Sequence, residues 1–278
     1  MTLLKKTGGA RMKDASAYVL DCKANDLVAF KTIKSADEVD AEDFVHVALS
    51  KLVKQNKTIV VKIHEADTEF AVKEVKSMKT LAKYRNVVRY ICSFECLDNF
   101  EKWIKPVKED VRFCTDGPQK LCFIAMEYIP DGDLTEFLRN HSHDIKLVKS
   151  LLLQIAMVII ELGTIYKLCH GDINSGNILI AKTSKKNLTY QLFDEKYTLP
   201  TFGFMPIMLD FGHCREYEHR ASNKKAILQD VLSAWSVFAN WLPIYLEPII
   251  RSFVGDELKT NKHLKDVKGA MERLANLF

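Results

Sequence analysis

Residues 168–180 read Leu-Cys-His-Gly-Asp-Ile-Asn-Ser-Gly-Asn-Ile-Leu-Ile, a polar turn followed by a short apolar run. An apolar run of this length after a polar turn predicts a buried strand. The turn holds two side chains that can do chemistry, the carboxylate of Asp172 and the carboxamide of Asn177. Further along, residues 207–212 read Ile-Met-Leu-Asp-Phe-Gly, so a second apolar strand delivers Asp210 into a glycine turn.

Two acids and one amide at the ends of neighbouring strands are typical of a site that transfers a phosphoryl group. Asp172 can accept the proton of an attacking hydroxyl. Asn177 and Asp210 provide oxygen ligands that can hold Mg²⁺ against the phosphates of a nucleotide. The alternative, two unrelated polar turns, accounts for either segment alone but poorly for both in this order.

The two segments together, His-x-Asp-x4-Asn and then Asp-Phe-Gly, resemble the protein-kinase superfamily. The resemblance implies an α+β, two-lobed protein-kinase-like fold. Its small β-rich N-lobe would span residues 1–129, and its reduced α-helical C-lobe residues 130–278. The resemblance also implies ATP and Mg²⁺ as cofactors, with Asp172 as the catalytic base and Asn177 and Asp210 as the metal ligands.

A kinase also needs a lysine on its third strand, which binds phosphate and pairs with a glutamate on the following helix. Two lysines are candidates: Lys31, in Val-Ala-Phe-Lys, and Lys62, in Ile-Val-Val-Lys. Lys62 is followed by a predicted helix at residues 67–84 and then by an apolar strand at residues 86–94. We therefore expect Lys62 to bind phosphate and Lys31 to lie on the second strand.

The predicted helix after Lys62 carries an acid on its apolar face. Phe70, Glu74, Met78 and Leu81 fall on one side of it at 100° per residue. A carboxylate on a core-facing stripe is costly unless a cation lies beside it, and Lys62 can supply that cation. The other interpretation places Glu74 at the border of the stripe, in solvent; we favour the pair with Lys62.

The segment before Lys62 predicts a strand pair within residues 18–33 and then a helix over residues 36–54. This helix would form an insert, at about residues 35–57, that the usual kinase lacks at this place. The family's glycine-rich loop, G-x-G-x-x-G-x-V, is absent. Gly8-Gly9 is either a reduced version of that phosphate-covering loop or part of a flexible N-terminus.

Residues 121–134 read Leu-Cys-Phe-Ile-Ala-Met-Glu-Tyr-Ile-Pro-Asp-Gly-Asp-Leu, a buried strand, an extended polar stretch and the beginning of a helix. By the resemblance to kinases, this is the strand and hinge whose backbone binds the adenine edge. It implies Met126 as the gatekeeper, with nucleotide contacts from the main chain of Glu127 and Ile129. In isolation, the pattern also suits an ordinary strand, turn and helix.

The second half of the chain follows the same resemblance. The helical spacing of apolar residues predicts a core helix over residues 144–168. A long excursion between residues 180 and 207 contains Tyr-x-x-Pro-Thr-x-Gly-Phe-x-Pro, which is similar to kinases of large DNA viruses. After Gly212 the activation segment is limited to residues 213–229. Asp230 is then implied to brace the catalytic loop.

Three further residues of the catalytic turn, His170, Gly171 and Asn174, bear on its structure and activity. His170 is expected to pack and hydrogen-bond within the loop. Gly171 replaces the usual Arg that pairs with a phosphorylated activation segment, so we expect activity that does not depend on such phosphorylation. Asn174 stands where serine/threonine kinases place a lysine on the γ-phosphate. The pattern His-Gly-Asp-x4-Asn also resembles aminoglycoside and choline phosphotransferases and the atypical RIO kinases.

Composition indicates an ordinary globular protein, with 47% hydrophobic and 27% charged residues among 278. The formal net charge of +4 is mild and does not indicate nucleic acid as a partner. Seven cysteines without a CxxC pair favour a reduced intracellular compartment, cytoplasmic or nuclear, or the host cell if viral, over a disulfide framework. We expect neither a signal peptide nor a membrane span, since polar residues interrupt the longest apolar stretch.

The expected activity is ATP- and Mg²⁺-dependent transfer of the γ-phosphate to a Ser or Thr hydroxyl of a protein. A protein acceptor is favoured because residues 126–134 look more like protein kinases than small-molecule kinases. Two alternatives stay open: a phosphotransferase that acts on a small-molecule hydroxyl, and a catalytically weak pseudokinase that binds partners. Asn174 and the poor glycine loop favour the pseudokinase, whereas the intact acids and Lys62 argue against it.

Overall fold

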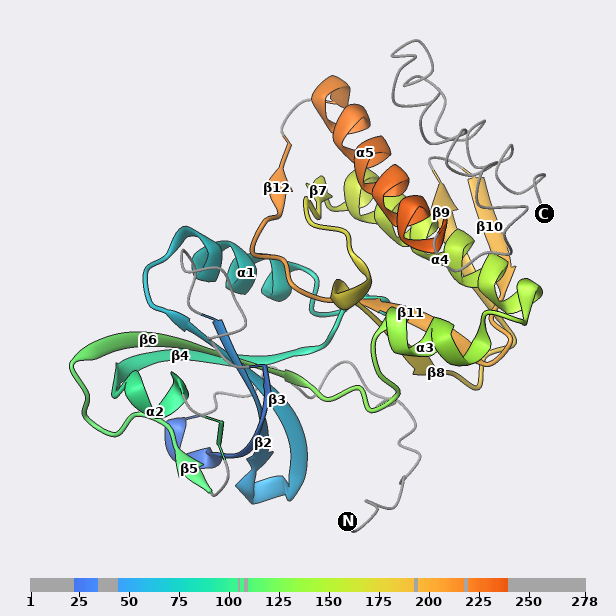
Figure 1. Ribbon diagram of the computed structural model, residues 1–278. Helices are drawn as coiled ribbons and strands as arrows, with labels where there is room; N and C mark the ends of the chain where they lie inside the picture. Colours follow the sequence, from blue (N-terminus) through green and yellow to red (C-terminus); the bar gives the residue numbers. More distant parts are fainter. Residues whose placement is uncertain are drawn as a thin grey trace. The chain divides into compact units, whose positions relative to one another are not determined.

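The computed structural model describes residues 23–34, 45–104, 106–107, 110–192, 195–217 and 220–239 (Figure 1). These residues divide into two compact units. The sheet unit comprises the described residues up to Tyr128 together with Asp210–Gly212. The helical unit comprises the described residues of Ile129–Leu209 and those that follow from His213 onward.

The sheet unit is built on one six-stranded antiparallel sheet, in the order β4-β6-β3-β2-β1-β5. Three short helical turns and one longer helix, α1, accompany it. Its elements are η2 Ala24–Asp26, β1 Leu27–Lys34, β2 Val45–Leu52, η4 Val53–Gln55, β3 Lys57–Glu65, α1 Glu69–Thr80, β4 Tyr90–Asp98, α2 Glu101–Ile104, β5 Val111–Arg112 and β6 Gln119–Glu127.

The helical insert expected at residues 35–57 is wrong, because residues 45–52 form strand β2 between β1 and β3. The buried positions of β2 alternate: His46, Ala48, Ser50 and Leu52. Two of these four are polar, so the period of two is hidden in the sequence, and the apolar residues that remain mimic a helical spacing. Backbone pairing on both sides of the strand decides in favour of β structure.

The prediction that Lys31 lies on the second strand counts a first strand near residues 18–22, which the structure does not describe. Lys31 lies on β1, the described strand that pairs with β2, and β2 in turn pairs with β3, the strand of Lys62. The link between β1 and β2, residues 35–44, contains no glycine in its sequence. Gly8-Gly9 and the strand expected near residues 18–22 lie outside the described residues.

One face of the sheet carries an aromatic core. Trp103 stacks on Phe113 with ring centroids 5.1 Å apart, and both meet Phe123 edge-on. Aliphatic residues of β1, β2, β3 and β6 surround these rings, including Ala48 and Ile63. Since side chains alternate along a strand, Lys62 and His64 point to the other face of β3 from Ile63. The other face therefore remains available for α1 and for polar side chains.

The link between β4 and β6 is organised by the buried carboxylate of Asp98. Its oxygens accept hydrogen bonds from Trp103 Nε1 (3.3 Å), Cys114 N (3.1 Å) and Thr115 Oγ1 (2.9 Å). Lys102 Nζ lies 2.5 Å from the same carboxylate. Burial alone would raise the pKa of Asp98, but Lys102 and the N–H donors outweigh it and hold that pKa below its usual 3.8.

A disulfide closes the same link. Cys96 and Cys114 are bonded, with Cα atoms 5.6 Å apart and a separation of 18 positions in the sequence. The expectation of reduced thiols is therefore wrong for these two residues, because spacing along the chain did not reveal that β4 and the returning loop lie side by side. Cys122, Cys169 and Cys214 are buried and form no disulfide among the described residues.

The helical unit is built around α4, which confirms the helix predicted at residues 144–168. Helix α5 and the β9–β10 hairpin both contact α4. The hairpin is what the long excursion after residue 180 forms. The elements are α3 Leu134–His141, α4 Ile145–Ile165, β7 Leu168–Cys169, η5 Ser175–Asn177, β8 Ile178–Lys182, β9 Asn187–Leu192, β10 Glu195–Pro200, β11 Phe204–Met208, β12 Arg215–Glu216 and α5 Arg220–Ala239.

The polar residues that interrupt α4 bind the hairpin. Glu161 Oε1 accepts the N–H of Gln191 at 2.5 Å, and Gln154 Oε1 accepts the hydroxyl of Tyr190 at 3.3 Å. These contacts satisfy groups that would otherwise be costly to bury. Among the helices that the structure describes, none is both long and apolar enough to cross a membrane.

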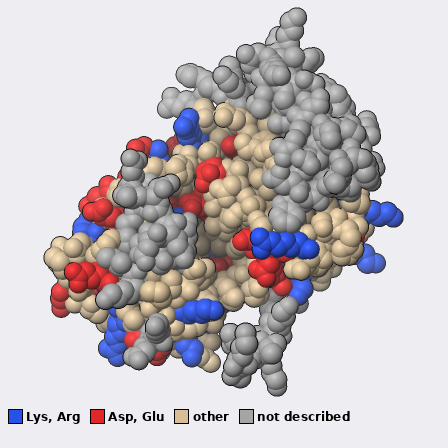
Figure 2. Space-filling model, in the orientation of Figure 1, with Lys and Arg blue, Asp and Glu red and all other residues tan. Residues whose placement is uncertain are grey.

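On the face shown in Figure 2, basic and acidic side chains are interspersed over the described residues. This distribution agrees with the mild net charge of +4. Two charged side chains, Asp98 and Lys62, are instead buried inside the sheet unit.

We predict that Asp98→Asn destabilises the protein by about 3–5 kcal/mol. The amide has no negative charge to pair with Lys102, and its NH₂ group would face the N–H donors that now bind the carboxylate. Urea unfolding measures the effect. Asp116→Asn is the matched control: Asp116 is exposed in the same link, and asparagine tolerates its φ of 53°. An Asp98 variant as stable as the control would contradict this role.

The same variant has a pH signature. The pKa of Asp98 is lower in the folded protein than its usual value of 3.8. Ionised Asp98 therefore stabilises the fold at pH values above 3.8, and this stabilisation is lost as the pH falls through the folded-state pKa. The stability difference between the wild type and Asp98→Asn should therefore shrink below about pH 4. Denaturant titrations across this range check it, and a difference that grows on acidification would show the sign to be wrong.

Candidate active site

In the sheet unit, the site is organised around the ammonium group of Lys62. Its Nζ lies 2.8 Å from Glu74 Oε2 and 2.8 Å from Asp210 Oδ1. Lys62 is 6% exposed and Glu74 1%, so both charges are inside the protein. The expected pairing of Lys62 with Glu74 is present in the structure, and Asp210 joins it from a distant part of the sequence.

Glu74 reaches Lys62 because of how α1 begins and packs. The side chain of Thr68 caps the helix by accepting the N–H of Ala71 at 3.2 Å. From that start, Glu74 and Met78 fall on the buried face, as the 3.6-residue spacing predicted, and Ala71 is buried with them, whereas Phe70 is only half-buried. The acid is thus carried inward with the apolar residues of its helix.

The directions of the pKa shifts favour the charged forms of Lys62 and Glu74. Burial alone would lower the pKa of Lys62, but the carboxylates of Glu74 and Asp210 outweigh it and raise that pKa. Burial alone would raise the pKa of Glu74, but Lys62 and a hydrogen bond from His64 hold it below its usual range. The result is a permanent cation facing two acids.

His64 was missed by the sequence analysis. Its Nε2 lies 2.9 Å from Glu74 Oε2, the same oxygen that Lys62 contacts. A signal was present, because a residue two positions after Lys62 on a strand shares its face. That pattern had been used only for the lysine.

The remaining site residues of the sheet unit lie in the Asp-Phe-Gly turn and at the end of β6. Asp210 has φ of 64°, a conformation that aspartate tolerates better than most residues, and Phe211 after it is fully buried. Met126 pairs with Val60 of β3 and with Tyr90 of β4 near the end of β6. Glu127 follows as the last residue of β6.

Glu127 ties that strand end to its neighbour. Its N–H donates to Arg89 O at 3.0 Å, while its Oε1 accepts the N–H of Arg89 at 2.9 Å. Ile129 comes two residues later and belongs to the helical unit, where it is buried. The adenine contacts assigned to Glu127 and Ile129 remain a prediction.

In the helical unit, two amides hold the carboxylate of Asp172. Asn174 Nδ2 donates to Asp172 Oδ1 at 3.1 Å, and Asn177 Nδ2 donates to Asp172 Oδ2 at 2.8 Å. Asn174 Oδ1 also accepts the N–H groups of Gly176 and Asn177, so it caps the short turn η5. Both ends of the Asn174 side chain are therefore engaged in its own loop, whereas the sequence analysis assigned it to phosphate.

His170 and Asp230 support this loop as expected. His170 Nε2 donates to Leu209 O at 2.9 Å, and its Nδ1 accepts the N–H of Asp172 at 3.3 Å. Asp230 accepts the N–H groups of His170 at 2.7 Å and of Gly171 at 3.2 Å. Burial raises the pKa of Asp230, although His170 and the two N–H donors oppose that shift. The loop is thus fixed from both of its ends.

The conformation of the loop explains why residue 171 is a glycine. Its φ is 81°, which favours glycine, and a Cβ at this position would lie 2.6 Å from the carbonyl oxygen of His213. No side chain fits there without moving the backbone. The Arg that kinases usually carry is therefore excluded by the conformation of this loop.

The donor set suits Mg²⁺ and a nucleotide. Because Asn177 uses its Nδ2 for Asp172, its Oδ1 is directed to other partners, and no hydrogen bond to this oxygen occurs among the described residues. Asp210 adds a carboxylate whose side chain is 30% exposed. The described residues contain no cluster of three or more His, Cys, Asp or Glu that could hold a metal ion. Each unit thus offers an oxygen atom of the kind that Mg²⁺ prefers, from Asn177 in the helical unit and from Asp210 in the sheet unit.

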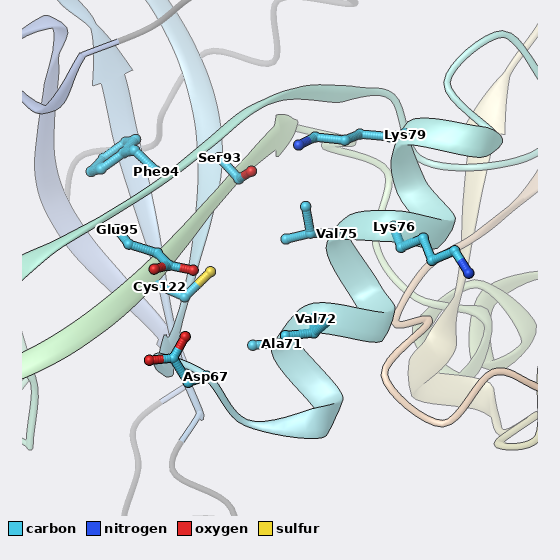
Figure 3. A pocket seen from close by; sticks show the side chains of 10 residues that line it. All are labelled: Asp67, Ala71, Val72, Val75, Lys76, Lys79, Ser93, Phe94, Glu95 and Cys122. Atoms are coloured by element: carbon cyan, nitrogen blue, oxygen red, sulfur yellow. The ribbon is translucent and has the colours of Figure 1, made fainter.

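A cavity of about 460 Å³ lies between α1 and the β4–β6 edge of the sheet (Figure 3). Val75 and Lys79 face Ser93 and Cys122 across it. None of the predicted site residues lines this cavity. It adjoins α1, the helix that carries Glu74.

Comparison with known proteins gives one family and several relatives. Residues 33–235 match the family described as "Protein tyrosine and serine/threonine kinase". Serine/threonine-protein kinase haspin of Bos taurus is 33% identical over 89 residues, which cover 32% of this chain and 11% of that protein. Uncharacterized protein 098R of Invertebrate iridescent virus 6 is 30% identical over 83 residues, or 28% of this chain and 14% of that protein.

A third relative, uncharacterized protein ZK177.2 of Caenorhabditis elegans, is 44% identical over 46 residues, which cover 16% of each chain. Each of these alignments spans less than a fifth of the relative's own length. The family match is broader, because it extends from β1 to α5 and covers well over half of the sequence. With this match and its α+β fold, the chain belongs to the protein tyrosine and serine/threonine kinase family.

Proposed function

We propose that this protein is an ATP- and Mg²⁺-dependent kinase that transfers the γ-phosphate to a Ser or Thr hydroxyl of a protein. The observation that carries the proposal is the buried Lys62, held at 2.8 Å by both Glu74 and Asp210. A lysine, a helix glutamate and the Asp of Asp-Phe-Gly are the three groups a kinase needs for phosphate and metal. The haspin similarity supports a Ser or Thr acceptor.

Each residue has a defined task in this proposal. When bound, ATP supplies the phosphoryl group, and Mg²⁺ neutralises charge on its phosphate oxygens. Lys62 binds phosphate, Glu74 orients Lys62, and Asn177 and Asp210 would hold the metal. Asp172 accepts the proton of the acceptor hydroxyl. Its two amide partners keep the carboxylate in one orientation, as a base in proton transfer requires.

A small-molecule acceptor is the second candidate, favoured by one observation. Gly171 gives the loop the His-Gly-Asp form that resembles aminoglycoside and choline phosphotransferases, and its backbone leaves no room for Arg. Assaying transfer to small hydroxyl compounds alongside protein acceptors distinguishes the two. A pseudokinase would transfer phosphate to neither.

The choice of lysine is tested by substitution. Lys62→Met should lower the rate of phosphoryl transfer by at least about 100-fold, because it removes the charge that binds phosphate. Lys31→Met is the matched control, since Lys31 is exposed on β1 and should keep nearly full activity. A labelled-ATP assay measures both. Equal losses in the two variants would remove Lys62 from its assigned role.

The metal assignment has a readout that does not need activity. ATP should raise the melting temperature more with Mg²⁺ than with a chelator, because Mg²⁺ links the nucleotide to protein oxygens. Asp210→Asn should remove this difference. Asp131→Asn serves as the control, because Asp131 is paired with Lys182 and has no assigned role. Equal ATP-induced shifts with and without metal would contradict the assignment and favour a pseudokinase.

Activity should be independent of phosphorylation of the activation segment. Gly171 occupies the position before Asp172 where kinases usually carry the Arg that binds a phosphate, and the expected activation segment, residues 213–229, is short and includes the beginning of α5, so it costs little entropy to order. Phosphatase treatment should leave the initial rate unchanged, as should Ser222→Ala combined with Tyr217→Phe. A drop of about tenfold, or roughly 1.4 kcal/mol of barrier, would show that a phosphate-dependent switch exists.

A further inference from the structure

Glu74 is held by two residues of β3, and only one of them belongs to the usual kinase pair. Lys62 Nζ and His64 Nε2 lie 2.8 and 2.9 Å from the same oxygen, Oε2. His64 is 4% exposed and Glu74 1%. An ionised carboxylate can only accept hydrogen bonds, so the Nε2 of His64 carries the hydrogen and donates it.

The two donors have different duties. Lys62 also contacts Asp210, and in a kinase it must direct hydrogen bonds to the phosphates as well. Its ammonium has three N–H donors to divide among Glu74, Asp210 and phosphate, so the share that Glu74 receives depends on what else Lys62 binds. His64 contacts Glu74 from the same strand and has no task toward phosphate. It supplies a donor that Lys62 does not have to share.

We propose that His64 is a positioning residue that fastens Glu74, and with it α1, to β3, so that the Lys62–Glu74 pair stays formed whatever else Lys62 binds. In kinases generally, the position of this helix and the activation segment control whether the pair forms. A second fastening inside the sheet unit removes the need for that control. The catalytic consequence rests on the proposed function; the fastening itself does not.

The first experiment measures the fastening without any activity. Urea unfolding of the full chain is followed for the wild type, His64→Leu, Glu74→Gln and the double variant. The two substitutions should be coupled by at least about tenfold in the unfolding equilibrium constant, because His64→Leu removes the donor of this contact and Glu74→Gln removes the charge of its acceptor. Coupling below about twofold would overturn the proposal. If His64→Leu does not fold, His64→Asn replaces it, since its amide takes the place of Nδ1 rather than of Nε2.

The matched control is His46→Leu. His46 is also a fully buried histidine of the same sheet, but it lies on β2 with its ring 5.6 Å from that of Trp103. It contacts the aromatic core and not Glu74. Its substitution should destabilise the fold without coupling to Glu74→Gln. Equal coupling for both histidines would mean that the cycle reports general loosening, which would also overturn the proposal.

The second experiment measures positioning through ATP. His64→Leu should lower kcat/KM for ATP by about tenfold or more, whereas His64→Gln, which keeps a donor near the place of Nε2, should recover activity to within about threefold of wild type. A residue that only fills space would be replaced better by Leu than by Gln, and that order would contradict the proposal. If the wild type transfers no phosphate, the proposed function fails, while the unfolding cycle still decides the fastening.

Discussion

The ammonium group of Lys62 is the interaction on which the sheet unit depends. It joins β3 to the next helix, α1, and to the Asp-Phe-Gly turn, which is far away in the sequence. Isolated charges at this depth would cost several kcal/mol each, so the arrangement is stable only when the partners are in place. The requirement that makes the site chemically useful, a fixed cation between two acids, is therefore also a requirement of folding.

The catalytic turn of the helical unit follows a different principle. Asp172 is held by neighbours along its own loop, Asn174 and Asn177, while Asp230 binds the loop backbone from α5. The positive φ of Gly171 lets the chain pass close to His213, where no side chain fits. This loop is completed by its own hydrogen bonds and does not contain an Arg to respond to a phosphate. Within the sheet unit, His64 beside Glu74 likewise holds a side chain through contacts of the fold itself.

Much of this could be predicted from the sequence, because the strongest signals are local. The helical spacing around Glu74 placed an acid on a buried face, and the strand after Asn177 and the strand before Asp210 were both expected. The failures were not local. The sequence predicts a helix where β2 lies, because the polar residues His46 and Ser50 occupy two of the buried positions of this strand. Only its pairing with β1 and β3 identifies it as a strand. The Cys96–Cys114 disulfide and the contact of His64 with Glu74 likewise depend on which elements meet in space.

The central claim is that these residues transfer phosphate from ATP to a protein hydroxyl. The most direct measurement incubates the full chain with γ-labelled ATP, Mg²⁺ and a mixture of Ser- and Thr-containing acceptor proteins, and then identifies the labelled amino acids. The wild type should label serine or threonine, and Asp172→Asn should lose at least about 100-fold of that rate while still binding ATP. Absence of transfer by a wild type that binds ATP and Mg²⁺, or an unchanged rate in Asp172→Asn, would contradict the claim.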